Sequence, residues 1–182
     1  MGHKAGWLAL YAGIAGGADI ILIPEIPYDL DCISRHLKER SRRGRNYSVV
    51  VVAEGAMSVE EEQMSKKERK KFRSETVVSS ISHRIANEIE IETSMESRAT
   101  VLGYVQRGGI PSPADRILAT SLGTGAAEHL ARGEYGRMMA IAGNEITSVD
   151  LSVPADKIKT VPLDHRMVNN ALSLGICLGN EL

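Results

Sequence analysis

Two arginines bracket the stretch of this chain that is best suited to bind an anion. Arg98 and Arg107 lie at the ends of an alternating apolar segment, and Gly108, Gly109 and a proline-containing turn follow the second arginine. Guanidinium groups held at strand ends bind planar anions such as phosphate through two parallel hydrogen bonds. Glycines let main-chain N–H groups approach the same anion closely. These residue types therefore predict a phosphate-binding site.

The spacing of the two arginines limits how they can act. An extended strand from 98 to 107 would separate them by roughly 30 Å, at about 3.3 Å per residue, so they cannot hold one phosphate within one subunit. Either one arginine is structural, or Arg98 reaches a site of a neighbouring subunit, which predicts an oligomer with shared sites. A solvated arginine at each strand end is the alternative without a function.

A carboxylate follows directly on a run of valines. Residues 47–53 predict a buried strand, and Glu54 and Gly55 come immediately after it. Ligands of open α/β sheets bind beyond the carboxyl ends of the strands. Glu54 is therefore placed to accept hydrogen bonds from a sugar hydroxyl, the alternative being an exposed glutamate that begins a loop.

The elements that must position these residues alternate along the chain. Helical patterns are expected at 7–15, 31–43, 77–89, 115–131 and from 164 or 165, and strands at 20–23, 47–53, 100–105 and 138–142. This order predicts an α/β fold of three layers, with a mostly parallel sheet between two layers of helices. Asp31 and Asp115 are expected to cap helices, and Arg84 is expected to pair with Glu88 one turn on.

Composition excludes several classes of protein. The net charge of −1 argues against a general nucleic-acid binder. The basic run 66–71 is offset by the acids at 60–62, so 60–73 is interpreted as a solvated helix or a mobile loop. No apolar run reaches the roughly 18 residues of a membrane span. Cys32 and Cys177 show no metal or disulfide spacing and fit a reducing cytoplasm. No metal site is expected.

Four stretches of the chain together resemble the 6-phosphofructokinase family. They are the segment 1–19, the strands with their following turns at 20–25 and 50–55, and the arginine-bracketed stretch 98–116, in the family's order. The resemblance covers nearly the whole chain and implies the C-terminal, sugar-phosphate-binding half of an ATP- or pyrophosphate-dependent enzyme. The family's Gly-rich donor loop and its segment with the catalytic base have no counterpart here, so no catalytic residue is expected in this chain.

The resemblance implies roles for individual residues. It implies binding of fructose 6-phosphate by Met1, Gly2, Glu54, Tyr104 and Arg107, with Arg98 donated to an adjacent subunit. Tyr104 stands where the family usually has a histidine. It can donate a hydrogen bond but cannot become a cation near neutral pH, so weaker binding or an altered substrate preference is expected. An unchanged affinity for fructose 6-phosphate in Tyr104→His would contradict this. His3 replaces an arginine near the transferred phosphoryl group, and histidine is uncharged much of the time at pH 7.

A second site is implied by the same resemblance. Gly17, Asp19, Arg43 and Arg45 resemble positions of the allosteric effector site of the bacterial enzymes, between subunits. The alternative for the two arginines is that basic residues at a helix C-terminus offset the helix dipole.

The function implied is transfer of a phosphoryl group from ATP or pyrophosphate, with Mg²⁺, to the 1-hydroxyl of fructose 6-phosphate in glycolysis. The resemblance further implies a cytoplasmic homo-oligomer, a tetramer or a dimer, in which a missing N-terminal half carries the donor site, so the chain alone is expected to be inactive. Residues 1–106 and 157–182 would form the smaller, sugar-phosphate domain, and 107–156 a segment of the larger, nucleotide-binding domain with exposed apolar surface. A non-catalytic sugar-phosphate-binding or regulatory module, or an assembly fragment, is the alternative.

Overall fold

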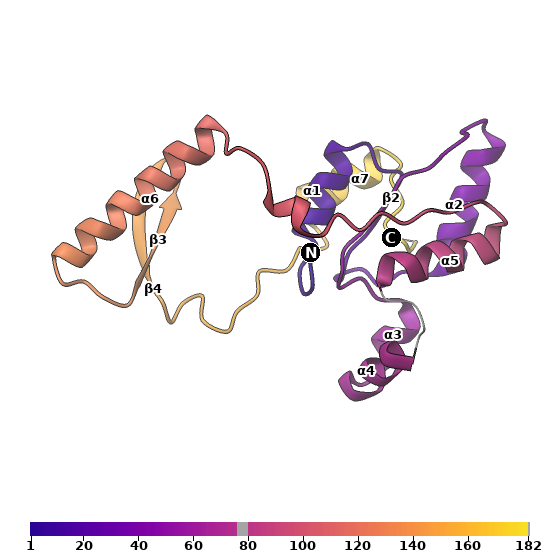
Figure 1. The fold of residues 1–182 in the computed structure, drawn as a ribbon, viewed down its shortest axis with the longest axis horizontal. Coiled ribbons are helices and arrows are strands. Elements are labelled where there is room, and N and C mark those ends of the chain that lie inside the picture. Colours follow the sequence, from indigo (N-terminus) through magenta and orange to yellow (C-terminus); the bar gives the residue numbers. More distant parts are fainter. Residues whose placement is uncertain (76–79, 182) are drawn as a thin grey trace. The chain divides into compact units, whose positions relative to one another are not determined.

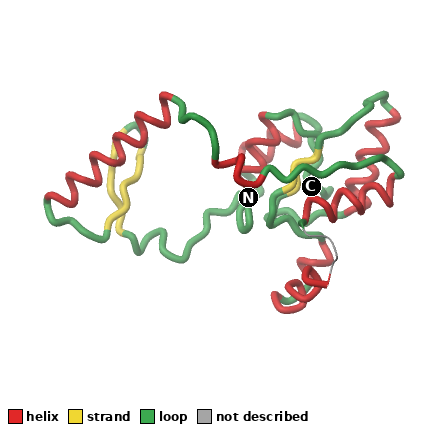
Figure 2. The backbone as a smooth tube through the Cα atoms, viewed as in Figure 1, coloured by secondary structure: helices red, strands yellow, loops and turns green. Residues whose placement is uncertain are grey.

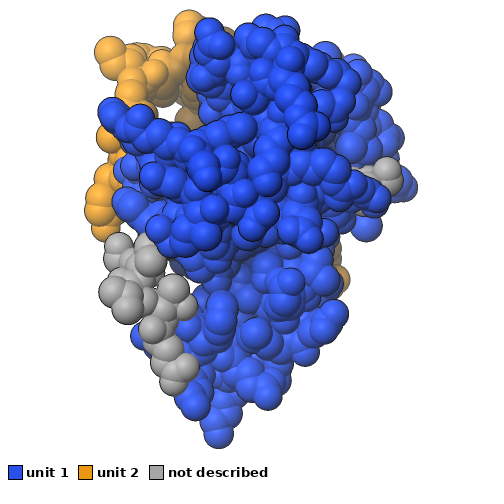
Figure 3. Space-filling model, turned by 90° about the vertical axis from the view of Figure 1, so that its right-hand side faces the viewer, with its two compact units in different colours: residues 1–101, 159–182 blue, residues 102–158 orange. Residues whose placement is uncertain are grey.

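The chain forms two compact units in the computed structural model, which describes residues 1–75 and 80–181. Unit 1 comprises 1–101 and 159–182, and unit 2 comprises 102–158 (Figure 3). The borders expected from the sequence, at 106/107 and 156/157, lie a few residues from these. The assignment of the units to two domains of a larger enzyme stays a prediction.

A parallel sheet lies at the centre of unit 1. Strand β1 (Ile20–Leu22) pairs in parallel with β2 (Val50–Val52), with Ile20 opposite Val50. On the other side of β1, Cys177 forms a single parallel bridge with Ile20. The expected strands at 20–23 and 47–53 are thus present, although each is shorter than the apolar run that predicted it. Runs of β-branched residues suit such strands because both of their faces are covered.

One face of this sheet is covered by two helices. Helix α1 (Trp7–Ala15) and helix α7 (Arg166–Ser173) pack with Ile21 and Ile23 in one apolar cluster (Figure 1). A Cβ on Gly13 of α1 would lie 2.6 Å from Cδ1 of Ile21, so a glycine there allows the helix to approach the strand closely.

The other face is covered by helix α2 (Leu30–Arg42) and helix α5 (Ile81–Thr93). The alternate residues of β1, Ile20 and Leu22, join Ile33, Leu37, Ile85 and Ile89 in a second cluster. Unit 1 is therefore a three-layer α/β/α arrangement, which confirms the predicted fold class. The helix that was expected to begin at position 77 corresponds to α5, and position 77 itself lies outside the described residues.

Two short charged helices follow β2. Helix α3 (Val59–Gln63) begins with a capping box in which Ser58 and Glu61 bond reciprocally, and α4 (Lys66–Glu75) is largely exposed. The charged segment 60–73 is therefore mostly helical, but it is not the fully solvated helix that was one of the two interpretations, because Glu61 is 1% exposed.

Unit 2 contains a helix and a β-hairpin. Helix α6 (Pro113–Ala131) is followed by β3 (Arg137–Ala142) and β4 (Glu145–Asp150), which pair antiparallel with Arg137 opposite Asp150. Strand β4 was not predicted. None of the residues 102–158, all of which are described, is buried, and apolar side chains such as Ile110 are 94% exposed.

The predicted caps are wrong by a few positions. The N-cap of α2 is Asp29, whose carboxylate accepts from the N–H of Asp31 at 2.9 Å. The N-cap of α6 is Ser112, whose Oγ accepts from the N–H of Asp115 at 3.2 Å. In both helices an acid expected at the cap lies in the first turn instead, where it still faces the positive end of the dipole.

The predicted strand at 100–105 is absent. Residues 94–102 have no regular structure and lead into a short 3₁₀-helix, η1 (Gly103–Arg107), as Figure 2 shows. The apolar alternation suits a strand, but a strand also needs a neighbour that takes its main-chain hydrogen bonds. No described residue pairs with this segment. The separation of roughly 30 Å between Arg98 and Arg107, which assumed a strand, therefore does not apply.

Candidate functional site

A tight turn at the carboxyl end of β2 carries Glu54. The N–H of Glu54 donates to the carbonyl of Met1 at 3.0 Å, and that of Gly55 donates to the carbonyl of Gly2 at 3.0 Å. A Cβ on Gly55 would lie 2.2 Å from the His3 carbonyl oxygen, so only glycine allows this approach. The start of the chain is thereby held against the turn.

The same turn gathers a carboxylate and an imidazole. Oε2 of Glu54 lies 3.1 Å from Nδ1 of His3 and 3.4 Å from the main-chain nitrogen of Met1. The Glu54 side chain is 51% exposed, so its carboxylate is open to a ligand. The structure therefore brings together Met1, Gly2 and Glu54, three of the predicted binding residues, whose role in binding stays a prediction. The contact of His3 with Glu54 was not predicted, because the two residues are distant along the chain.

The arginines and the tyrosine of the predicted phosphate site belong to other segments of the chain than the Glu54 turn. Arg98 is 86% exposed, and its Nη2 lies 2.6 Å from Oε1 of Glu96. Tyr104, 88% exposed, and Arg107 both belong to η1 in unit 2, whereas Glu54 belongs to unit 1. Their participation in one site stays a prediction.

A second candidate site is a hollow of about 270 Å³ in unit 1. Its lining consists of Gly17, Asp19, Arg40, Arg45, Asn46 and Tyr47. Nη2 of Arg40 lies 2.6 Å from Oδ1 of Asp19, and Oδ2 of Asp19 accepts from the N–H of Val49 at 2.8 Å. Arg40 is thus already paired, and the exposed Arg45 is the cation best placed to meet an anion in the hollow.

Three of the four predicted effector residues line this hollow, and Arg43 does not. The Arg43 side chain is exposed and pairs with Glu39 one turn back on α2. Arg40, Asn46 and Tyr47 were missed, although their proximity to Arg45 in the sequence was a usable signal. His36 lies one turn before Arg40, and burial together with the Arg40 charge lowers the pKa of His36.

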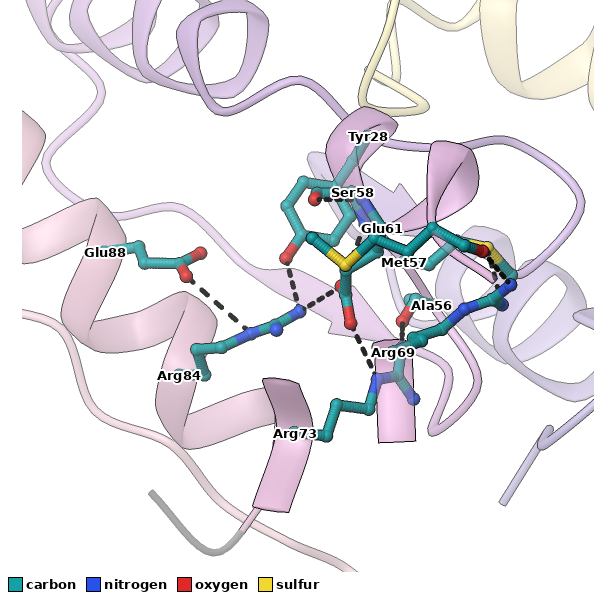
Figure 4. A network of polar contacts seen from close by, with 10 residues as sticks. Tyr28, Ala56, Met57, Ser58, Glu61, Arg69, Arg73, Arg84 and Glu88 are labelled. Atoms are coloured by element: carbon teal, nitrogen blue, oxygen red, sulfur yellow. Dashed lines mark hydrogen bonds and ion pairs between the residues drawn. The ribbon is translucent and has the colours of Figure 1, made fainter. Parts of the chain in front are cut away.

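A buried ion cluster centred on Glu61 joins helices α3, α4 and α5 (Figure 4). Glu61 is 1% exposed and accepts from Nε of Arg73 at 2.7 Å and from Nη2 of Arg84 at 2.5 Å. Burial alone would raise the pKa of Glu61, but the hydrogen bonds from Arg84 and Arg73 outweigh it and lower the pKa. The burial of Glu61 was not predicted, because Glu61 lies between Glu60 and Glu62 in a charged segment and nothing in the local sequence distinguishes it from a surface residue.

Two further members of the cluster surround Arg84. Nη2 of Arg84 also donates to the Tyr28 hydroxyl at 3.0 Å, and its Nε lies 3.7 Å from Oε1 of Glu88, which confirms the predicted i,i+4 pair. Burial raises the pKa of Tyr28 to about 12. Burial also raises the pKa of Glu88, although the nearby Arg84 charge opposes this.

The two cysteines, far apart in the sequence, lie close together in unit 1. The thiols of Cys32 and Cys177 are both free, and Cys177 is near enough to affect the pKa of Cys32. Burial, with the neighbouring Cys177 thiol, raises the pKa of Cys32 to about 11, so Cys32 is a protonated thiol at neutral pH. Over the described residues, no group of histidine, cysteine and acidic side chains is arranged to hold a metal ion. No helix in the same part of the chain is long and apolar enough to span a membrane.

Comparison with known proteins identifies relatives over the whole chain. The phosphofructokinase family model matches residues 1–130. The chain is 57% identical over 180 residues to the ATP-dependent 6-phosphofructokinase of Spirochaeta thermophila, which covers 99% of this chain and 49% of that protein. It is 47% identical over 179 residues to ATP-dependent 6-phosphofructokinase 3 of Bacteroides thetaiotaomicron, with 98% and 48% covered. The chain thus spans about half the length of the curated relatives it matches.

Solved structures agree with these matches. A crystal structure of pyrophosphate-dependent phosphofructokinase from Marinobacter aquaeolei matches with a TM-score of 0.71 at 25% identity, over 99% of this chain and 47% of that one. The T-state phosphofructokinase of Pichia pastoris matches with a TM-score of 0.62 at 32% identity, over 84% of this chain and 16% of that one.

The fold and the Glu54 turn define an α/β protein with its candidate site at the carboxyl end of a parallel strand, where open sheets bind their ligands. With the matches above, the chain belongs to the phosphofructokinase family.

Proposed function

We propose that this chain supplies the fructose 6-phosphate-binding half of a 6-phosphofructokinase. The observation that carries the proposal is the turn after β2, where the backbone N–H groups of Glu54 and Gly55 bond to the carbonyls of Met1 and Gly2 and the Glu54 carboxylate stays accessible. A carboxylate fixed in this way accepts hydrogen bonds from sugar hydroxyls. The names of the relatives at 57% and 47% identity support ATP as the donor, while a structural neighbour at 25% identity is named as pyrophosphate-dependent.

Each predicted binding residue then has a part in holding the acceptor. Glu54 orients the sugar, and Arg107 and Tyr104 bind its phosphate. In a homo-oligomer, Arg98 binds the phosphate of the sugar that is held in the site of an adjacent subunit. Reaction of the 1-hydroxyl with the terminal phosphoryl group depends on positioning and charge stabilisation more than on covalent chemistry. The catalytic base, the donor site and the Mg²⁺ that accompanies the donor would belong to the other half of the enzyme.

The hollow lined by Asp19 and Arg45 supports a second, regulatory role for this chain. Its size and its exposed arginine suit a small phosphate-bearing effector. In this second candidate function, the chain binds sugar phosphate and effector without completing a catalytic site.

The test joins this chain behind the first half of the Spirochaeta relative and measures ATP-dependent phosphorylation of fructose 6-phosphate. Glu54→Gln should raise the KM for fructose 6-phosphate about tenfold or more, because a hydrogen bond to a charged group is worth about 1.5–3 kcal/mol. The KM for ATP should stay constant. Glu62→Gln, an exposed glutamate on α3, is the matched control.

A folded but inactive fusion that also fails to bind fructose 6-phosphate would contradict the proposal. A fusion that binds fructose 6-phosphate through Glu54 without turnover would favour the regulatory module instead.

A further inference from the structure

The main chain around Glu54 is held by contacts other than those with Met1 and Gly2. Ala56, two residues after Glu54, is fully buried, and its carbonyl accepts from Nη2 of Arg73 at 3.0 Å. Arg73 lies on α4, a helix that is otherwise largely exposed. One guanidinium therefore connects α4 both to Glu61 and to the main chain of the turn.

A second line of contacts reaches the same turn through Tyr28. The N–H of Tyr28 donates to the carbonyl of Met57 at 2.9 Å, and the N–H of Val59 donates to the carbonyl of Tyr28 at 3.0 Å. The hydroxyl of Tyr28 accepts from Arg84 on α5. Arg84 thus fixes the far end of a side chain whose main chain pairs with residues 57–59.

Glu61 joins the two lines. Its carboxylate accepts from both arginines, and Oε2 also accepts from the N–H of Ser58 at 3.2 Å, which closes the capping box of α3 (Figure 4). Contacts from α3, α4 and α5 therefore converge on residues 56–59, directly after Glu54. Replacing a buried ion cluster as a whole by apolar residues is often neutral for stability, and in some proteins such a cluster instead specifies one geometry.

We infer that Arg73, Glu61 and Arg84 are positioning residues for acceptor binding: they fix the main chain of residues 56–59 and so the direction of the Glu54 carboxylate. The inference rests on the proposed function, because it takes Glu54 to be the group that meets the sugar. In consequence α4, which contains none of the predicted binding residues, sets the affinity for fructose 6-phosphate.

A double-mutant cycle between Arg73 and Glu54 tests the inference. Arg73 is chosen because it lies at the edge of the cluster, 36% exposed, and its loss leaves the pair of Glu61 and Arg84 in place. Binding of fructose 6-phosphate is measured by calorimetric titration. The protein titrated is the full chain, alone or fused to the first half of the Spirochaeta relative, according to which of the two binds fructose 6-phosphate. The proteins compared are unaltered, Arg73→Gln, Glu54→Gln and the double variant, with exposed Lys67→Gln on the same helix as control.

Arg73→Gln should weaken fructose 6-phosphate binding about three- to tenfold when Glu54 is present, and less than twofold in the Glu54→Gln background. Lys67→Gln should change nothing. A merely structural role would give the same fold-change in both backgrounds, and that result, or no change with Arg73→Gln, would overturn the inference. If Glu54→Gln alone leaves the affinity unchanged, the proposed acceptor site fails, and the inference fails with it.

Arg73→Lys is a second variant that controls for misfolding of Arg73→Gln. Arg73→Lys keeps a positive charge beside Glu61 but removes the Nη2 contact with Ala56. It should therefore weaken binding while thermal unfolding stays close to that of the unaltered protein. Full affinity in a folded Arg73→Lys variant would show that the contact with Ala56 does not position the turn.

Discussion

Gly55 is the residue on which the geometry of the candidate site most directly depends. Its backbone is not in the left-handed region, so its need is for space alone. In Gly55→Ala the added Cβ would meet the carbonyl oxygen and carbon of His3 at 2.2 and 2.6 Å, main-chain atoms that cannot rotate away. We expect a loss of about 1–3 kcal/mol of unfolding free energy and weaker fructose 6-phosphate binding. Denaturant unfolding and calorimetry measure both.

Gly123→Ala provides the control for that substitution. A Cβ at Gly123, inside α6, would meet nothing within 4 Å, and alanine favours a helix over glycine by up to about 1 kcal/mol. It should be neutral or stabilising. Equal effects of the two substitutions would mean that the approach of residues 2–3 to the turn is not a constraint.

Single residues also show what the sequence could and could not predict. Glu54 was placed correctly, because a run of valines followed by a carboxylate and a glycine obeys a general rule for parallel sheets. The contact of His3 with Glu54 and the burial of Glu61 were missed, because each depends on a partner supplied by tertiary structure. Arg43 was placed in the effector site, but a glutamate one turn back holds it outside the hollow.

At the scale of elements, helices α3, α4 and α5 are joined by charged side chains. The pKa of Glu61 on α3 is lowered and that of Glu88 on α5 is raised, so the two carboxylates affect stability in opposite directions as pH changes. The pKa of Glu61 is lowered from its ordinary 4.5, so its contribution is present above about pH 4.5 and is lost as pH falls through the lowered value. Glu61→Gln leaves two arginines without their shared partner and should cost about 3–5 kcal/mol of unfolding free energy at pH 7. Urea unfolding between pH 3 and 7 measures this.

Glu88→Gln is the matched substitution on α5. The pKa of Glu88 is raised by burial, so any stability that its protonated form contributes is lost as pH rises through the raised value. At pH 7 its replacement by a neutral amide should therefore not lower the unfolding free energy. If Glu88→Gln were as destabilising as Glu61→Gln, the assignment of Glu61 as the centre of the cluster would be wrong.

The elements that were predicted correctly are those with a complete local pattern. They are helices α1, α2, α6 and α7 and strands β1, β2 and β3, whose apolar patterns and flanking glycines and prolines lie within a few positions of each boundary, although the caps of α2 and α6 were predicted at the wrong residue. The segment 100–105 shows the limit of that approach. Its apolar alternation is typical of a strand, but no described part of this chain offers it an edge, and so it forms a loop and a turn of 3₁₀-helix.

The molecule as a whole leaves a large apolar surface uncovered in unit 2. Ile110 is 94% exposed, Ile117 69% and Tyr135 75%, although α6 and the β3–β4 hairpin pair with each other. Exposed apolar patches of this kind mark association surfaces. We expect the chain alone to self-associate at micromolar concentration, and the double variant Ile110→Lys, Ile117→Lys to do so less, as measured by sedimentation equilibrium.

Ile91→Lys serves as the comparison for that experiment. Ile91 is 74% exposed on α5 of unit 1 and lies outside the surface in question. Its substitution should leave the association constant unchanged. A chain that stays monomeric at all concentrations would show that the exposed apolar residues of unit 2 do not form a contact surface.

The bridge between Ile20 and Cys177 has a consequence for how the protein is made. Ile20 and Cys177 lie side by side in one sheet, although unit 2 and most of the helices separate them in the sequence. At the usual 5–20 residues per second of synthesis, β1 leaves the ribosome roughly ten to thirty seconds before its second neighbour exists. During that interval one edge of a fully apolar strand is unpaired, which is the condition under which nascent chains aggregate or engage chaperones.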